Sequence, residues 1–157
     1  MHHSYLALGS NLQNPGKQIE KTIIAISNLN HSRLLQQSSL YQTKPLLPPE
    51  RPDEIQEDYV NAVIKIATQL SPKALLRETQ AIETNMGRVR SEKRWQARII
   101  DIDILLYDDV YMETPPLTIP HPEMQKRLFV IEPLYEIAPD LILPMGKSLK
   151  DVYLQLK

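Results

Sequence analysis

The chain has 157 residues, of which 42% are hydrophobic and 24% are charged. This size and composition argue against disorder and predict a single domain over residues 1–157. A formal net charge of −1, no cysteine and no long apolar run exclude a global basic field, disulfide or thiolate chemistry and a transmembrane helix, so we expect a cytoplasmic location without nucleic-acid or membrane partners.

The N-terminal elements are predicted as strand, helix and strand. An apolar run at residues 5–8 ends at a glycine-containing turn, which predicts a strand. A proline at the start and isoleucines at helical spacing predict an amphipathic helix over about residues 14–29. A second strand is expected at about residues 34–43. Residues 44–58 are proline-rich and acidic without periodicity, which predicts a long loop.

The central part of the chain continues with a strand and a second helix. Alternation over residues 59–67 predicts a strand with Ala62 and Ile64 on one face and Asn61 on the other. The pair Ser71-Pro72 is typical of a helix start, and Gly87 is typical of a helix end. The expected buried side of this helix consists of Leu75, Leu76, Thr79, Ile82 and Met86.

The C-terminal part completes the predicted topology. A strand is expected at residues 99–107, a proline-rich loop at 115–122, a helix at about 127–137 and an edge strand at 141–143. The order β-α-β-β-α-β with a C-terminal helical extension is typical of an α+β ferredoxin-like fold. In that fold an antiparallel sheet carries its helices on one face.

The sharpest local motif is Asp101-Ile102-Asp103. On a strand the two carboxylates share one face, with backbones about 7 Å apart. Oxygen ligands of this kind suit Mg²⁺, and two metal ions can share such a pair and hold a phosphate chain. The alternative interpretation is the solvated face of an amphipathic strand.

A basic segment precedes this motif and strengthens the metal interpretation. Guanidinium groups beside acidic metal ligands suit a triphosphate. With 4 glycines forming neither a P-loop nor a dinucleotide fingerprint, phosphates would be bound by side chains and metal. The alternative is a solvated loop. The cations are Arg88, Arg90, Lys93, Arg94 and Arg98.

Other polar residues have weaker patterns. Gln80 and Glu83 are expected to share a polar helix face, which could equally be ordinary helix surface. Tyr59 and Asn61 share a strand face and could hold a flat heterocycle, or form a cross-strand pair. His121 lies between two prolines and could equally be a capping or solvent-facing histidine. No nucleophile motif is present, which favours direct in-line transfer.

Short motifs along nearly the whole chain, from Tyr5 to about Met145, occur in a specific order and spacing. They are Leu8-Gly9-Ser10-Asn11-Leu12, Tyr41-Gln42-Thr43-Lys44-Pro45-Leu46, Asp58-Tyr59-Val60-Asn61-Ala62-Val63, Gln80-Ala81-Ile82-Glu83, Gly87-Arg88-Val89-Arg90, Arg94-Trp95, Arg98-Ile99-Ile100-Asp101-Ile102-Asp103-Ile104, Leu117-Thr118-Ile119-Pro120-His121, and Arg127 with Phe129. Together they resemble the 6-hydroxymethyl-7,8-dihydropterin pyrophosphokinases of folate biosynthesis.

The resemblance implies a Mg-dependent diphosphokinase with the ferredoxin-like fold. We expect the protein to act as a monomer. ATP and 6-hydroxymethyl-7,8-dihydropterin would give AMP and the pterin diphosphate, with two Mg²⁺ ions on Asp101 and Asp103. Arg88 and Arg98 would be catalytic arginines that hold the phosphates. The implied ATP-binding residues are Gln80, Glu83, Arg88, Arg90, Trp95, Arg98, Ile104, Thr118, His121 and Arg127. The implied pterin-binding residues are Thr43, Pro45, Leu46, Tyr59, Asn61, Trp95 and Phe129.

Two other functional classes compete with this interpretation. A nucleotidyltransferase also combines Gly-Ser with two aspartates, but usually close together, whereas Ser10 and Asp101 are about 90 residues apart. A small-ligand regulatory module could share the fold, yet it would have no need for two aspartates beside five cations.

Gln96 and Ala97 depart from the Gly and Pro that the family usually has there, and Pro116 stands where members often have Arg.

Overall fold

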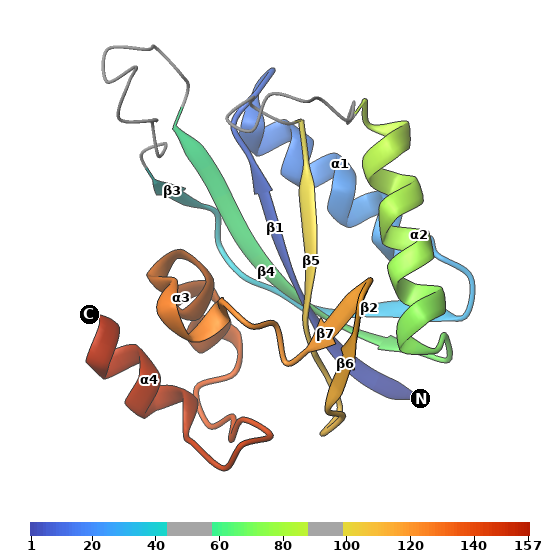
Figure 1. Cartoon of the computed structure of the whole chain (residues 1–157). Coiled ribbons are helices and arrows are strands. Elements are labelled where there is room, and N and C mark those ends of the chain that lie inside the picture. Colours follow the sequence, from blue (N-terminus) through green and yellow to red (C-terminus); the bar gives the residue numbers. More distant parts are fainter. Residues whose placement is uncertain (44–57, 88–98) are drawn as a thin grey trace.

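The elements of the computed structural model, which describes residues 1–43, 58–87 and 99–157, follow the predicted order along the chain (Figure 1). The sheet strands and their helices come first, followed by a small hairpin and the C-terminal helices. They are β1 (His2–Ser10), α1 (Pro15–Ser27), β2 (Ser32–Gln37), β3 (Tyr41–Thr43), β4 (Tyr59–Thr68), α2 (Pro72–Asn85), β5 (Asp101–Tyr107), β6 (Met112–Thr114), β7 (Leu117–Ile119), the 3₁₀ turn η1 (Met124–Lys126), α3 (Leu128–Ile137) and α4 (Leu149–Leu156).

The main sheet has the order β2-β4-β1-β5. The short strand β3 also pairs with β4, further along the same edge of β4 that β2 occupies. All of its pairings are antiparallel. Each βαβ crossover therefore skips one strand position, as it does in a split βαβ fold. The α+β ferredoxin-like prediction is confirmed.

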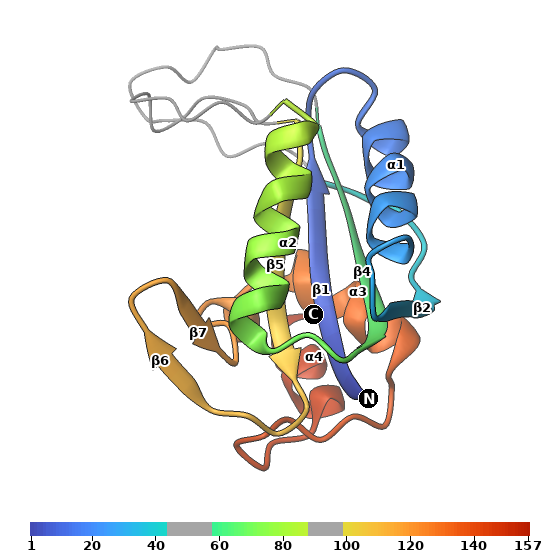
Figure 2. The same ribbon diagram turned by 90° about the vertical axis from the view of Figure 1, so that its right-hand side faces the viewer.

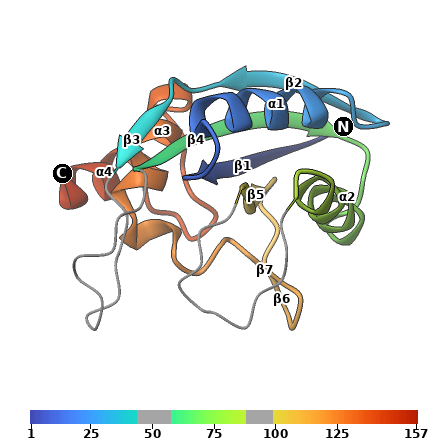
Figure 3. The ribbon, with the colours of Figure 1, turned by 90° about the horizontal axis from the view of Figure 1, so that it is seen from above.

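Helices lie on both sides of this sheet (Figure 2). The face that carries Leu6, Ile64 and Ile102 packs against buried residues of α1 and α2 such as Ile19 and Leu75. The opposite face is covered in part by α3 and α4. Seen from above, α2 and α4 lie on opposite sides of the molecule (Figure 3). The predicted pair of helices on one face and the C-terminal helical extension are both confirmed.

The predicted strand over residues 34–43 is divided into β2 and β3. Ser38 lies at the break, where its backbone N–H donates to the Val63 carbonyl at 2.9 Å and its Oγ accepts from the Val63 N–H at 2.9 Å. A serine hydroxyl that replaces a backbone partner interrupts the regular ladder. The prediction of one continuous strand over about residues 34–43 is therefore wrong.

Two predictions about the C-terminal part are also wrong. The proline-rich stretch 115–122 contains β7, which pairs with β6 and buries Leu117 and Ile119. The prolines lie in the turn before β7 and after it, where they do not interrupt the pairing. Residues 141–143, which are described, do not form the expected edge strand. Only an isolated bridge joins Ile142 to Ser148 there.

The ends of α1 differ slightly from the prediction. The helix begins at Pro15, as expected, but Asn14 has a φ of 68° and makes no side-chain capping bond. The helix ends at Ser27, two residues before the predicted end. The second helix starts as predicted, with Ser71 Oγ accepting from the Ala74 N–H, and Gly87 follows it with a φ of 97°.

Candidate active site

Four directly opposite residues, one on each of β5, β1, β4 and β3, form a row across the sheet, which we call the register row. It places a predicted metal ligand and a predicted pterin residue on the same face of the sheet. Asp101 on β5 is opposite Gly9 on β1, Gly9 is opposite Asn61 on β4, and Asn61 is opposite Tyr41 on β3. Directly opposite residues project from the same face of an antiparallel sheet. Adjacent strands lie about 4.8 Å apart, so two strand spacings, roughly 10 Å, separate the backbones of Asp101 and Asn61.

Asp101 and Asp103 occupy the same face of β5, opposite Gly9 and Ala7. Both are partly buried, while Ile102 and Ile104 point to the helix-covered face and are 6% and 3% exposed. The alternation predicted for this strand is confirmed. No group of three or more His, Cys, Asp or Glu residues suited to a metal occurs in ranges 1–43, 58–87 and 99–157. Two carboxylates fit Mg²⁺, which is commonly bound by one or two carboxylates together with waters and substrate phosphates.

A buried carboxylate braces the strand between these aspartates. Glu83 on α2 is 5% exposed, and its Oε2 accepts a hydrogen bond from the Ile102 N–H at 2.8 Å. Among the described strands β5 pairs only with β1, so this N–H on the outer edge takes a side-chain partner. The prediction that Gln80 and Glu83 share a polar helix face is wrong for Glu83, because Gln80 is exposed and Glu83 is buried.

We expect Glu83→Ala to lower the free energy of unfolding of the ligand-free protein by about 1–3 kcal/mol, because the buried Ile102 N–H loses its acceptor. Chemical denaturation measures this change. Gln80→Ala is the matched control on the same helix, and we expect it to stay within about 0.5 kcal/mol of the unsubstituted protein. Equal effects of the two substitutions would contradict the bracing role of Glu83.

The start of β5 is fixed by two residues from other elements. The buried Ser10 hydroxyl at the end of β1 donates to the Ile99 carbonyl. A Cβ at Gly87 would lie 2.9 Å from the Ile99 side chain, and Gly87 also has a positive φ. The positive φ favours glycine at position 87, whereas the end of the Ile99 side chain could shift to make room for a Cβ. Ser10 and Gly87 therefore set where the chain enters the strand that carries the aspartates.

His121 lies beside the same strand. Its backbone N–H donates to the Leu105 carbonyl at 3.0 Å, and its Nδ1 accepts from the Glu123 N–H at 3.2 Å. A neutral ring in this arrangement carries its proton on Nε2. Burial lowers the pKa of His121, Asp103 and Glu123 act to raise it, and Arg127 acts to lower it. The structure therefore places His121 within electrostatic reach of Asp103 and Arg127.

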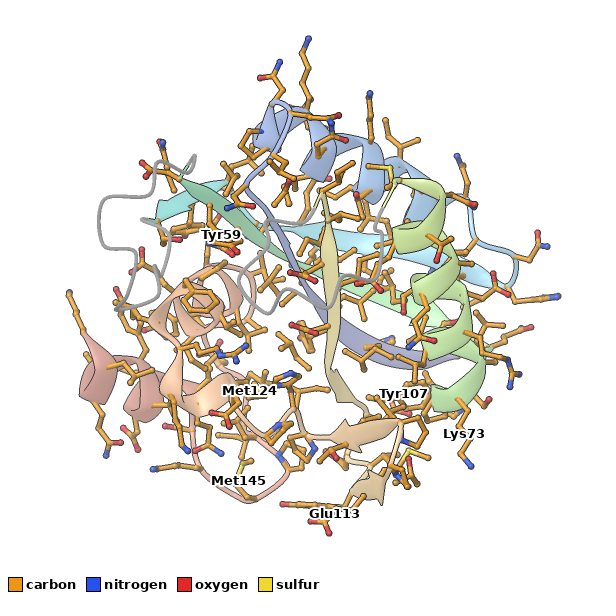
Figure 4. All side chains as sticks on the ribbon, turned by 45° about the horizontal axis from the view of Figure 1, so that its top comes forward. Tyr59, Lys73, Tyr107, Glu113, Met124 and Met145 are labelled. Atoms are coloured by element: carbon orange, nitrogen blue, oxygen red, sulfur yellow. The ribbon has the colours of Figure 1, made fainter. Side chains whose placement is uncertain are left out.

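The predicted pterin residues meet at the other end of the register row. Asn61 is 7% exposed, and its Nδ2 donates to Thr43 Oγ1 at 3.0 Å. Its Oδ1 would be 3.1 Å from a Cβ added to Gly9, so a residue without a side chain allows the amide to lie there. Tyr59 is directly opposite Thr43. Figure 4 shows Tyr59 at this end of the sheet and Tyr107 at the far end.

Gly9 is a site residue that the sequence reasoning did not select. It lies between the carboxylate and the amide of the row, and the available signal was its position directly after an apolar strand. Phe129 is 36% exposed on α3, and the Arg127 guanidinium lies 5.8 Å from the centre of its ring. This contact links a predicted ATP residue to a predicted pterin residue.

Three predicted ATP residues lie on separate elements. Gln80 is exposed on α2, Thr118 is on β7, and the Ile104 side chain belongs to the core on the helix-covered face. Six predicted site residues lie outside the described residues: Pro45, Leu46, Arg88, Arg90, Trp95 and Arg98. The basic segment with Lys93 and Arg94 lies outside them as well, and so do residues 44–57 of the loop predicted for residues 44–58.

The fold and this row of carboxylate, glycine and amide are those of a ferredoxin-like protein with a candidate phosphate-transfer site. A model of the family described as 7,8-dihydro-6-hydroxymethylpterin-pyrophosphokinase matches residues 5–139. The chain belongs to this family. It is therefore an enzyme, a diphosphokinase of the pterin pyrophosphokinase class.

Curated relatives span nearly the whole chain. A protein of Haemophilus influenzae named 2-amino-4-hydroxy-6-hydroxymethyldihydropteridine pyrophosphokinase is 48% identical over 97% of this chain and 91% of its own length. A protein of the same name from Pseudomonas aeruginosa is 43% identical over 94% of this chain and 88% of its own length.

Solved structures share the fold at low identity. An HPPK-DHPS structure in complex with substrates has a TM-score of 0.74 at 14% identity and covers 99% of this chain. A wild-type HPPK-DHPS of Plasmodium falciparum has a TM-score of 0.70 at 16% identity. This chain spans 45% and 43% of those longer chains.

Among the described helices, none is long and apolar enough to cross a membrane.

Proposed function

We propose that the protein transfers pyrophosphate from ATP to 6-hydroxymethyl-7,8-dihydropterin in tetrahydrofolate biosynthesis, with Mg²⁺ held by Asp101 and Asp103. The observation that carries the metal assignment is the register row, which aligns a carboxylate of β5 with the Asn61 amide of β4. The two halves of the site thereby face the same side of the sheet. We propose two ions, because a pair of carboxylates two residues apart can be shared between metals.

The reaction requires an in-line displacement at the β-phosphorus of ATP. The pterin hydroxyl oxygen forms a bond to this phosphorus and releases its proton to water. The bond from the phosphorus to the α,β-bridging oxygen breaks, and AMP leaves with that oxygen. Bound Mg²⁺ would neutralise charge on the phosphate oxygens. Asp101 and Asp103 would hold this Mg²⁺ through their carboxylates. His121 would supply a donor near Asp103, and Arg127 would supply one near His121.

The pterin half of the site recognises a fused, flat heterocycle. The Asn61 amide offers both a donor and an acceptor, and its bond to Thr43 fixes the orientation of the amide. Tyr59 and Phe129 supply aromatic surface for the ring. Arg88 and Arg98 are proposed to hold the phosphates on the basis of their sequence positions, since both lie outside the described residues.

Product identification tests the reaction. The protein is incubated with Mg²⁺, the pterin and ATP labelled at the α- or the γ-phosphate. We expect the γ-label in the pterin product and the α-label in free AMP. A nucleotidyltransferase would attach the α-label to the acceptor, and a regulatory module would bind ligands without turnover, so either result contradicts the proposal.

We expect Asn61→Ala to weaken pterin binding far more than ATP binding. Loss of one hydrogen-bonding partner in a buried site costs about 1–3 kcal/mol, which corresponds to roughly a fivefold to 150-fold loss of affinity. Calorimetric titration of each ligand measures the two affinities separately. Equal losses for both ligands would instead indicate general damage to the sheet and contradict the assignment.

Three further expectations stay predictions. We propose that residues 1–157 form one pyrophosphokinase domain, that the domain acts as a monomer and that it functions in the cytoplasm. Size-exclusion chromatography with light scattering tests the monomer directly. A stable dimer at the enzyme concentration used in assays would contradict it.

A further inference from the structure

We propose that Glu136 is a positioning residue for the pterin half of the site and acts through Ser39 and Tyr41. The inference rests on the proposed function, because it concerns the pterin residues assigned there. Glu136 lies on α3, outside the register row, and it does not belong to the residues that the sequence motifs selected.

The strand that needs positioning is β3. It has three residues and pairs only with β4 among the described strands. It nevertheless carries Thr43, whose Oγ1 accepts from the Asn61 amide. A short outer strand has few ladder bonds of its own, so side-chain contacts contribute more to its placement. Whatever fixes β3 therefore also fixes the orientation of Asn61.

The Glu136 carboxylate makes four contacts to this segment. The Tyr41 hydroxyl donates to Oε1 at 2.6 Å, and the Ser39 hydroxyl donates to Oε2 at 3.0 Å. The Ser39 backbone N–H lies 3.1 Å from each carboxylate oxygen. Tyr41 is directly opposite Asn61 in the register row. One carboxylate of α3 thus holds the chain just before β3 and the first residue of β3.

The protonation states keep these contacts in place. Burial raises the pKa of Tyr41, and its hydrogen bond and charge interaction with Glu136 raise it further. Partial burial acts to raise the pKa of Glu136, but the bonds from Tyr41 and Ser39 hold it below its ordinary value. At neutral pH the tyrosine is therefore a neutral donor and the glutamate an ionised acceptor, which is the stronger form of this bond.

The same helix carries a second part of the pterin site. Phe129 and Glu136 are seven residues apart on α3, which is about two helical turns, so they lie on the same side of the helix. The helix itself is held to the sheet by Ile131 and Leu134, both fully buried. Glu136 is exposed at the surface. Its contribution is therefore to the relative placement of α3 and β3 rather than to the core.

The experiment compares Glu136→Gln and Tyr41→Phe with the full-length protein. We expect each variant to raise the KM for the pterin about fivefold, while kcat and the Kd for ATP stay within about twofold, since contacts of exposed groups contribute modestly. Glu132→Gln is the matched control: it removes a charge from the same helix near Tyr41 and should leave the pterin KM unchanged. Thermal unfolding monitors folding of every variant.

The outcomes are distinct. A raised pterin KM in both variants with unchanged ATP affinity supports the positioning role, even where the melting temperature falls slightly. An unchanged pterin KM in the folded Tyr41→Phe variant overturns it, as do equal losses for pterin and ATP. Absence of turnover in the unsubstituted protein overturns the proposed function itself, which separates the two failures.

Discussion

Replacing either Asp101 or Asp103 with alanine is expected to reduce turnover by about 10²–10³-fold or more, because the charge stabilisation that a bound metal supplies amounts to several kcal/mol. Asparagine at either position is expected to fail as well. An amide keeps the shape of the side chain but removes the negative charge that a hard cation requires of its ligand.

The fold is expected to survive these substitutions. Both aspartates lie on the face of β5 opposite the buried Ile102 and Ile104, so the core on the α1 and α2 side stays intact. Asp109→Ala is the matched control, since Asp109 is an exposed carboxylate in the turn after β5. Its turnover should equal that of the unsubstituted protein.

The measurements are steady-state turnover and the Mg²⁺ dependence of ATP binding by calorimetry. We expect Mg²⁺ to tighten ATP binding in the unsubstituted protein and in Asp109→Ala, and to have a much weaker effect in the aspartate variants. Near-normal turnover of both alanine variants at low Mg²⁺ would rule out the two-aspartate site.

The elements that alternate strictly were predictable from the sequence. Period-2 patterns in β4 and β5 place Asn61 and the two aspartates on the faces where the structure has them, because residues of a strand alternate between faces whatever the tertiary context. Their meeting in one row was not predictable. It depends on the register of four strands, which only the assembled sheet defines.

The features that the sequence did not reveal depend on partners far along the chain. Glu83 is polar by type and looks like helix surface, but it is buried because the Ile102 N–H on the outer edge of β5 needs an acceptor. Ser38 divides a strand because Val63 lies beside it. Glu136 lies in the last turn of the largely apolar helix α3, and its partners Ser39 and Tyr41 are almost a hundred positions away. No local pattern contains these contacts.

The second large effect is expected for Arg98→Ala, which should lower kcat by about 10²–10³-fold with only a modest change in the Kd for ATP. Arg98 lies outside the described residues, but its sequence neighbour Ile99 is anchored through its carbonyl to the Ser10 hydroxyl. Arg98 is three positions before Asp101, and a chain of that length spans at most about 11 Å. We therefore expect the guanidinium of Arg98 to reach phosphates held at Asp101.

The division between kcat and Kd follows from when the charge develops. Charge on the transferred group and on the leaving oxygen increases mainly during transfer, and interactions made only at that stage appear in kcat. Single-turnover kinetics beside steady-state rates isolate the chemical step from product release, and calorimetry gives the Kd for ATP. If the Kd rose in full proportion to the loss of kcat/KM while kcat stayed unchanged, Arg98 would bind ATP in the ground state and would have no catalytic role.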